Sequence, residues 1–246
     1  MIYQPRLKNH LSGRVANAVL LLLLAGWLAP GGRALMASAK TSRRYLPNGG
    51  KLSPVDALAD PGASDALKKA LEPKGYSVSL ADGTELCRIW LRSGVAAGKN
   101  EAQGAAYTWL ADSALIAVVT FPKATTDYRR QPLKAGTYTL RYAVHPQDGN
   151  HIGISPIRDF LLLTPVADDP NPNATPTFDE LVKQSKKASG TNHPAPMSLV
   201  TTDGITAWPS VIEDENGHLV LAARVKTSAG NESPVAFVVK GVVEHL

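Results

Sequence analysis

The chain has 246 residues, 26 of them Lys or Arg and 21 Asp or Glu, which gives a formal net charge of +5. Four of the basic residues and none of the acidic ones lie in the first 39 residues, so the rest of the chain carries 22 basic residues against 21 acidic ones. Such a balance does not create the positive field that holds nucleic acid or an anionic membrane surface. The sequence therefore predicts no nucleic-acid partner, and its single Cys excludes an internal disulfide.

The N-terminal 39 residues have the pattern of an export signal. Arg6 and Arg14 precede the apolar stretch 18–29, and Ala-Ser-Ala at 37–39 supplies the small residues that signal peptidase reads. The apolar stretch is shorter than the roughly 20 residues that span a bilayer, so cleavage after Ala39 is favoured over a retained anchor. We therefore expect an exported bacterial protein, periplasmic or extracellular, with no transmembrane anchor after cleavage.

A flexible segment and a short helix are expected next. Residues 40–63 begin with a polar stretch that is rich in Gly and Pro and has no apolar period, so we expect this segment to be flexible. Ser64 is a residue type that caps helices, and 65–71 has an acid at its start and two lysines further on. This pattern predicts a short helix that ends before Pro73.

Period-two alternation begins after this helix. Residues 76–80 and 85–91 alternate apolar and polar side chains, and Asp82-Gly83 lies between them, which predicts a β-hairpin. Cys87 lies on the apolar face of the second strand, so we expect a buried and inert thiol.

Four further strand patterns lie between residues 107 and 163. Residues 115–121 are apolar on both faces, which predicts a central strand. In 137–145 apolar residues alternate with polar ones, so we expect one face in the core and the other in water. The other two patterns are 107–110 and 159–163, and we expect the latter to pair with the strand before it.

The last third of the chain contains one more helix and two more strands. Thr175 precedes an amphipathic stretch, 176–188, which Gly190 ends. Residues 219–226 and 235–243 have strand patterns. Because the second of these is long and apolar, its edge needs a covering neighbour.

A count of about seven to nine strands favours two packed sheets over an alternating α/β fold. We therefore predict a mainly β fold, an antiparallel β-sandwich with one or two short helices, formed as a single domain by residues 64–246. The sequence has no Gly-x-Ser-x-Gly, His-Glu-x-x-His, Walker or dinucleotide-binding motif. These absences favour a protein that is not an enzyme.

The densest polar cluster lies between two predicted strands. Its residues are His145, Asp148, His151, Ser155, Arg158 and Asp159. Polar residues gathered at one end of a rigid β scaffold commonly form binding sites, so His151, Arg158 and Asp159 are candidate ligand-binding residues. In the structural alternative, the same residues only shape and anchor the loop.

Histidines give a second hypothesis. Neutral imidazoles with a carboxylate bind Zn²⁺ or Cu²⁺, and His145, His151 and His193 would supply three nitrogen ligands. Asp159 would then be a further ligand or would hold one of the rings. The hypothesis requires the three imidazoles to converge within ligand distance.

Trp90 is the aromatic candidate for ligand binding. By alternation it shares the wetter face of its strand with Arg88 and Arg92, where an exposed indole would stack on a sugar or peptide. In the structural alternative, the indole covers the edge of the core beneath an Arg side chain.

Residues 138–163, together with Gly190-Thr191-Asn192-His193-Pro194-Ala195, resemble an uncharacterised family of secreted bacterial β-rich proteins. The resemblance implies export and a single recurrent domain. It implies no activity and no functional residue.

The leading functional hypothesis is an exported, non-enzymatic protein without a cofactor. It would bind an unidentified small ligand, a glycan or an envelope protein through the loop end at 150–159, and an exposed apolar or aromatic patch would support it. The alternative is a metal-binding protein or metal-dependent enzyme that uses the three histidines. A purely structural role in the cell envelope is the third hypothesis.

Overall fold

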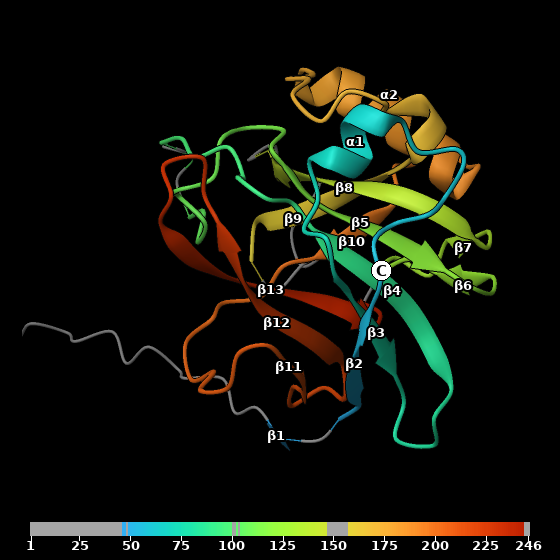
Figure 1. Ribbon diagram of the computed structural model, residues 1–246, viewed down its shortest axis with the longest axis vertical. Coiled ribbons are helices and arrows are strands. Elements are labelled where there is room, and N and C mark those ends of the chain that lie inside the picture. The colour runs from blue at the N-terminus through green and yellow to red at the C-terminus, as the bar shows by residue number, and fades with distance from the viewer. Residues whose placement is uncertain (1–45, 48, 100–101, 103, 147–156, 244–246) are drawn as a thin grey trace, which may run out of the picture. The chain divides into compact units, whose positions relative to one another are not determined.

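Two antiparallel sheets pack face to face and bury the main core between them (Figure 1). The strands are β1 (Leu46–Pro47), β2 (Lys51–Val55), β3 (Gly75–Ser79), β4 (Glu85–Leu91), β5 (Leu115–Phe121), β6 (Thr125–Thr126), β7 (Pro132–Leu133), β8 (Gly136–Val144), β9 (Asp159–Pro165), β10 (Pro196–Ser198), β11 (Ser210–Glu213), β12 (Leu219–Lys226) and β13 (Glu232–Lys240). The helices are α1 (Asp65–Lys69) and α2 (Phe178–Ser189), with a 3₁₀ turn at Val166–Asp168. The larger sheet has the order β10-β9-β8-β5-β4-β3-β2 and the smaller one β1-β11-β12-β13, while β6 and β7 form a separate hairpin.

The computed structural model describes residues 46–47, 49–99, 102, 104–146 and 157–243, all of which belong to one compact unit, Thr41–Leu246. The predicted export signal and His151 lie outside the described residues. The predicted fold class is confirmed: the protein is mainly β, with antiparallel sheets packed as a sandwich and two helices.

The inner faces of the two sheets form the core. Ile89, Leu140 and Leu161 of the larger sheet belong to the same buried cluster as Leu221 and Phe237 of the smaller one. Full burial of a side chain of this size contributes about 1.5–3 kcal/mol. This inner core is the feature that period-two alternation in the sequence predicted.

The outer face of the seven-stranded sheet is covered as well. The α1 region packs on Trp90 and Val118, and α2 packs on Phe160 and Leu162. Figure 1 shows both helices on the side of this sheet that faces away from β11–β13. Because protein packs on both faces of the sheet at these strands, β5 and most of β9 are apolar on both sides.

The prediction that one face of β8 lies in water is wrong. Thr139 and Arg141 on that face are buried, because the segment 168–174 folds over them. Asp169 in this segment accepts hydrogen bonds from Arg141 Nε at 2.7 Å and Nη2 at 3.0 Å, and from Thr139 Oγ1 at 2.7 Å. The polar residues of β8 therefore bind a buried partner instead of solvent.

The predicted flexible segment 40–63 contains two strands, so that prediction is wrong for β1 and β2. β2 forms the edge of the larger sheet and is largely exposed, with Lys51 and Pro54 among its exposed residues. A lysine and a proline on an edge strand oppose pairing with another chain. An exposed edge strand lacks a clear apolar period, which is why its sequence resembles that of a loop.

Residues 107–110 form a turn instead of the predicted strand. Tyr107 at its start is buried, and its hydroxyl donates to the carbonyl of Val200 at 2.6 Å. The same hydroxyl accepts a hydrogen bond from the backbone N–H of Ala236 at 3.0 Å. The aromatic residue that suggested a strand thus ties this turn to β13.

β13 has a neighbour on each side. β12 pairs with one edge, and on the other edge Leu199 bridges Phe237 and the N–H of Val200 donates to Ala236 O at 3.0 Å. The stretch 199–200 continues directly from β10, an edge strand of the larger sheet. The segment 196–200 therefore joins the two sheets and covers the apolar edge of β13, for which the sequence indicated no neighbour.

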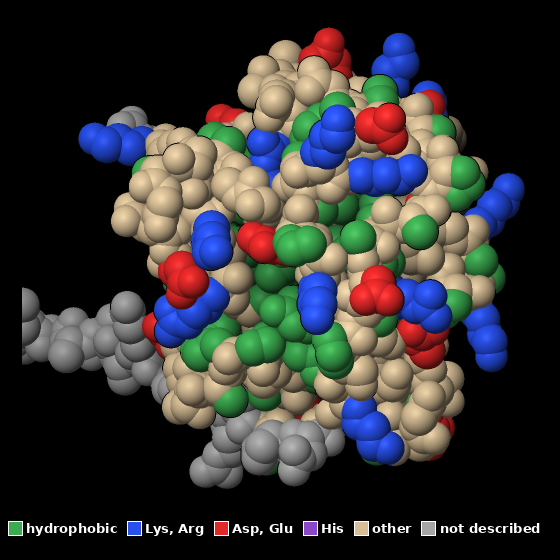
Figure 2. Space-filling model, viewed as in Figure 1, with side chains coloured by type: hydrophobic (Ala, Val, Ile, Leu, Met, Phe, Trp, Pro, Cys, Tyr) green, Lys and Arg blue, Asp and Glu red, His purple; other side chains and the backbone are tan. Residues whose placement is uncertain are grey.

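Charged side chains of both signs are interspersed on the face that Figure 2 shows, around a patch of hydrophobic side chains. This mixture agrees with the nearly balanced charge after residue 39. Within the described residues, no helix has both the length and the apolar character needed to cross a membrane.

Cys87 is buried in the core, as predicted. Burial, aided by the charge of Glu85, raises the pKa of the thiol to about 12. Because the thiolate is the reactive form, we expect native protein to resist Ellman's reagent at mildly alkaline pH and denatured protein to react completely. Absorbance of the released thiolate measures both, and rapid reaction of native protein would show that the thiol is accessible.

Candidate functional site

Asp159 is fully buried at the start of β9. Its Oδ2 accepts a hydrogen bond from the N–H of Ala106 at 2.7 Å, and its Oδ1 accepts from the N–H of Tyr107 at 3.0 Å and the Tyr142 hydroxyl at 2.7 Å. The carboxylate thus holds the connection before β5 against β8 and β9. This geometry supports the structural alternative for Asp159.

Arg158 and His145 lie together where β8 ends and β9 begins. Arg158 donates to the carbonyl of His145 through Nε at 3.0 Å and also through Nη2. The His145 ring stacks on Phe160, with the ring centroids 3.9 Å apart and the planes 14° from parallel. Since His151 lies outside the described residues, a ligand site formed by His151 and Arg158 stays a prediction.

His145 and His193 do not come together. The N–H of His145 donates to Arg158 O, whereas Ala195, two residues after His193, accepts from the N–H of Leu163. Leu163 lies five residue steps after Arg158 along β9, or about 17 Å away, whereas zinc ligands lie about 2 Å from the ion. Among the residues that the structure describes, no three His, Cys, Asp or Glu side chains are grouped to hold a metal. A site that combines both of these histidines is therefore excluded by the strand geometry.

Trp90 is buried at 5 % exposure, and its indole N–H donates to the carbonyl of Asp56 at 2.8 Å. The ring forms part of an open groove of about 660 Å³ on the outer face of the larger sheet, which Arg88 also lines. The hydroxyls of Thr120 and Thr137 in this groove bond to each other at 2.9 Å. Because the indole and both hydroxyls already have protein partners, the groove supports the structural alternative for Trp90.

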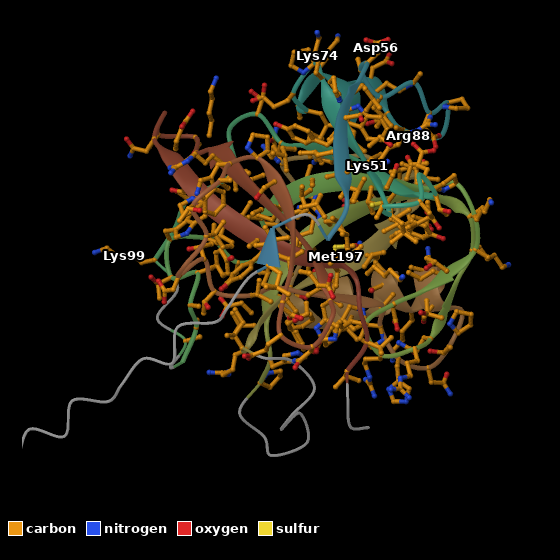
Figure 3. All side chains as sticks on the ribbon, turned by 90° about the horizontal axis from the view of Figure 1, so that it is seen from below. Lys51, Asp56, Lys74, Arg88, Lys99 and Met197 are labelled. Atoms are coloured by element: carbon orange, nitrogen blue, oxygen red, sulfur yellow. The ribbon has the colours of Figure 1, made fainter. Side chains whose placement is uncertain are left out.

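A more enclosed cavity, of about 400 Å³, lies where the β6–β7 hairpin faces the end of β13. We call it the hairpin cavity. Its apolar lining residues are Phe121, Leu133, Leu163, Pro196, Met197, Val238, Val239 and Val242, and its ionisable ones are Asp127, Tyr128, Arg130, His218 and Lys240. Figure 3 shows Met197 near the centre of the molecule, with Lys74 and Lys99 at its outside. In the lining itself, Arg130 and Lys240 are exposed while Leu133 and Met197 are buried, so the cavity extends from a charged rim to core residues.

Asp127 shapes the hairpin loop at the rim. Its Oδ1 accepts from the N–H groups of Arg129 and Gln131 at 2.8 Å each, and its Oδ2 accepts from Gln131 Nε2 at 2.7 Å. Burial raises the pKa of Asp127, and the hydrogen bonds from Gln131 and Arg129 oppose this only in part. A buried carboxyl with a perturbed pKa beside a cavity is a feature of binding sites.

His218 lines another wall of the cavity and forms a buried pair with Asp214. Nδ1 of His218 lies 3.1 Å from Asp214 Oδ2, and Nε2 lies 3.0 Å from the carbonyl oxygen of Val242. A neutral imidazole has one N–H and one acceptor nitrogen, so only the doubly protonated ring donates to both oxygens. At Gly241 a Cβ atom would lie 2.5 Å from Cδ2 of His218, so the segment after β13 packs directly on this ring.

These contacts suit binding better than catalysis. A general base needs a nitrogen or oxygen that reaches the proton it removes, but both nitrogens of His218 contact protein oxygens. The carboxylate of Asp127 already accepts three hydrogen bonds from its own loop. His218 and Asp127 thus have structural partners, and neither is placed as a general base.

We expect the Asp214–His218 pair to make stability depend on acid pH. Burial raises the pKa of Asp214, but hydrogen bonds from the side chain and N–H of His218, the histidine charge and the N–H of Asn216 together hold it below its ordinary value. A lowered native pKa stabilises the fold above the ordinary value near 3.8, and this stabilisation is lost as pH falls through the native value. Asp214→Asn should therefore lower the free energy of unfolding by about 2 kcal/mol at neutral pH. In urea unfolding, this free energy should fall less steeply with decreasing pH in the variant than in the wild type.

Asp127→Asn is the control of opposite sign. The raised native pKa of Asp127 means that protonation favours the folded state, so stability from this group is lost as pH rises through the native value. In Asp127→Asn, the free energy of unfolding should therefore fall more steeply with decreasing pH than in the wild type. If both variants change the pH slope in the same direction, the assignment of the two carboxyls is wrong.

The hairpin cavity could hardly be predicted from the sequence. Its ionisable residues come from 127–130, His218 and Lys240, three segments that no spacing pattern connects. One signal was present: no Gly occurs in the hairpin stretch 125–133, although such short loops usually need one at a left-handed position.

No protein-family model, curated protein or solved structure matches this chain.

Proposed function

We propose that the protein is an exported, non-enzymatic binding protein and that the hairpin cavity holds its ligand, a small organic molecule. The export signal predicted in residues 1–39 supports delivery to the periplasm or the medium. The described fold supplies the rigid scaffold on which such a site is built.

The lining of the cavity carries this proposal. Small-molecule sites are concave volumes of about 300–1,000 Å³ with mostly apolar walls and a few polar groups that orient the ligand. The hairpin cavity has about 400 Å³, and its apolar wall includes Leu133, Met197 and Val238. Asp127 and Arg130 from the hairpin loop supply polar groups at one side.

This site replaces the loop end at 150–159 as the preferred one. Asp159, the buried anchor of that loop end, has its carboxylate engaged by three protein donors. The hairpin cavity combines enclosed volume, apolar wall and charge within the described residues. A glycan or envelope protein bound elsewhere remains compatible with the same scaffold.

The test uses N-phenyl-1-naphthylamine, an uncharged dye that fluoresces in apolar sites. We expect saturable binding to the purified protein, and we expect Thr126→Trp to abolish it, because Thr126 is an exposed residue that lines the cavity and an indole there would fill the volume. Thr84→Trp, in the exposed turn between β3 and β4, is the matched control and should bind as the wild type does. Absence of binding, or equal binding by both variants, would reject the cavity as the site.

A further inference from the structure

We propose that the hairpin cavity selects an organic anion, a carboxylate or sulfonate with an apolar body, and that Arg130 determines this selectivity. The inference rests on the proposed function, since it names the ligand class of the same site. The backbone of the hairpin loop, the charges of the lining and the position of the apolar wall support it.

Arg130 has a backbone conformation that is costly for its residue type. Its φ is 64°, in the left-handed region. The N–H of Arg130 donates to Asp127 O, and the N–H of Asp127 donates to Gln131 O, which is the pattern of a three-residue hairpin loop with a left-handed third residue. Gly adopts that conformation without a steric penalty and Arg does not. An arginine at this position is therefore unfavourable for the turn and needs another reason.

The guanidinium of Arg130 supplies that reason. Arg130 lines the cavity at its rim, where Nη2 donates to the carbonyl of Val243 at 3.3 Å. Arg130 is exposed overall, and a guanidinium carries five N–H donors in all. A guanidinium fork at the rim of a cavity with an apolar inner wall is suited to a carboxylate or sulfonate that carries an apolar body.

Among the other charged groups of the described lining, Lys240 acts in the same direction as Arg130. Lys240 lies at the rim as a second cation, whereas the His218 ring contacts the carboxylate of Asp214 and the carbonyl of Val242. Asp127 is the acidic residue of this lining, and the groups around it already donate three hydrogen bonds to its carboxylate. The anionic group of the ligand would therefore lie at Arg130 and Lys240, with its apolar body toward Met197.

The test compares two dyes that differ by one anionic group: 8-anilinonaphthalene-1-sulfonate and its uncharged parent, N-phenyl-1-naphthylamine. We expect Arg130→Gly to weaken binding of the sulfonate about tenfold, as loss of one charge-assisted hydrogen bond would, and to leave the parent dye within about twofold. The melting temperature of Arg130→Gly should equal or exceed that of the wild type, because glycine removes the left-handed strain. Arg129→Gly, one residue earlier in the same loop and outside the lining, should leave the preference for the sulfonate unchanged.

Each outcome separates the two proposals. If the wild type binds neither dye, the proposed function fails. If the parent dye binds but Arg130→Gly weakens both dyes equally or neither, the cavity is a ligand site without anion selectivity, and the inference on Arg130 is overturned. A lower melting temperature of Arg130→Gly would also overturn it, since the arginine would then be present for stability.

Discussion

Arg141→Met is expected to lower the free energy of unfolding by about 3–5 kcal/mol, the cost of breaking a buried ion pair from one side. Arg141 is 1 % exposed and binds both carboxylate oxygens of Asp169. It also donates to the backbone carbonyls of Ser113, Asn171 and Ala174. Without it, the carboxylate of Asp169 and the carbonyl of Ser113 would remain buried with too few donors. Urea unfolding followed by circular dichroism measures the loss.

The exposed pair of Arg88 and Glu85 is the matched control. Arg88 Nε lies 2.8 Å from Glu85 Oε1, but half of the Arg88 side chain is exposed. Solvent screens such pairs, so Arg88→Met should cost at most about 1 kcal/mol. In the double variant Arg141→Met with Asp169→Leu, much of the stability should return, because no unpaired charge stays buried. Equal losses for Arg141→Met and Arg88→Met would show that the 168–174 segment does not depend on the buried pair.

Asp159→Asn is expected to cost about 2–3 kcal/mol, the loss that follows when buried donors lose a charged acceptor. The asparagine NH₂ group would face one of the backbone donors, Ala106 N–H or Tyr107 N–H, instead of accepting from it. We expect the melting temperature to fall and dye binding in the hairpin cavity to remain unchanged at temperatures where the variant is folded. The reason is distance: Leu163, which lines the cavity, is four residues further along β9, or about 13 Å.

The opposite result would show that Asp159 is a functional residue. A variant that keeps its stability but loses ligand binding would mean that the carboxylate contacts the ligand. Tyr142→Phe is the smaller control: it removes one donor to the same carboxylate and should cost about 1 kcal/mol.

Much of the fold could be predicted because it follows from local patterns. Apolar alternation identified β3, β4 and β8, two-sided apolar runs identified β5 and β9, and Ser64 and Gly190 marked the ends of helices. The covered edge of β13 could not be predicted, since the pairing of Val200 with Ala236 joins residues far apart in sequence. Short strands such as β10 and β11 contain too few residues to display a period.

The site was harder to predict than the fold, because polar residues look alike in sequence whether they bind a ligand or the protein itself. Arg141 was expected in water and forms a buried ion pair. Asp159 was a ligand candidate and anchors backbone N–H groups. His218, which the sequence did not single out, lies with both nitrogens bonded beside the hairpin cavity. Contacts between residues far apart in sequence decide which of these roles a side chain has. Alternation and motif spacing carry no information about such contacts.

Whether the hairpin cavity binds an organic anion can be measured by titrating the ¹⁵N-labelled protein with 8-anilinonaphthalene-1-sulfonate and following the amide chemical shifts. We expect the largest shifts at residues around the hairpin cavity, among them Tyr128, Arg130, Gly217 and Lys240. Shifts concentrated instead at Asp159 or around Trp90, with these four amides unchanged, would contradict this expectation.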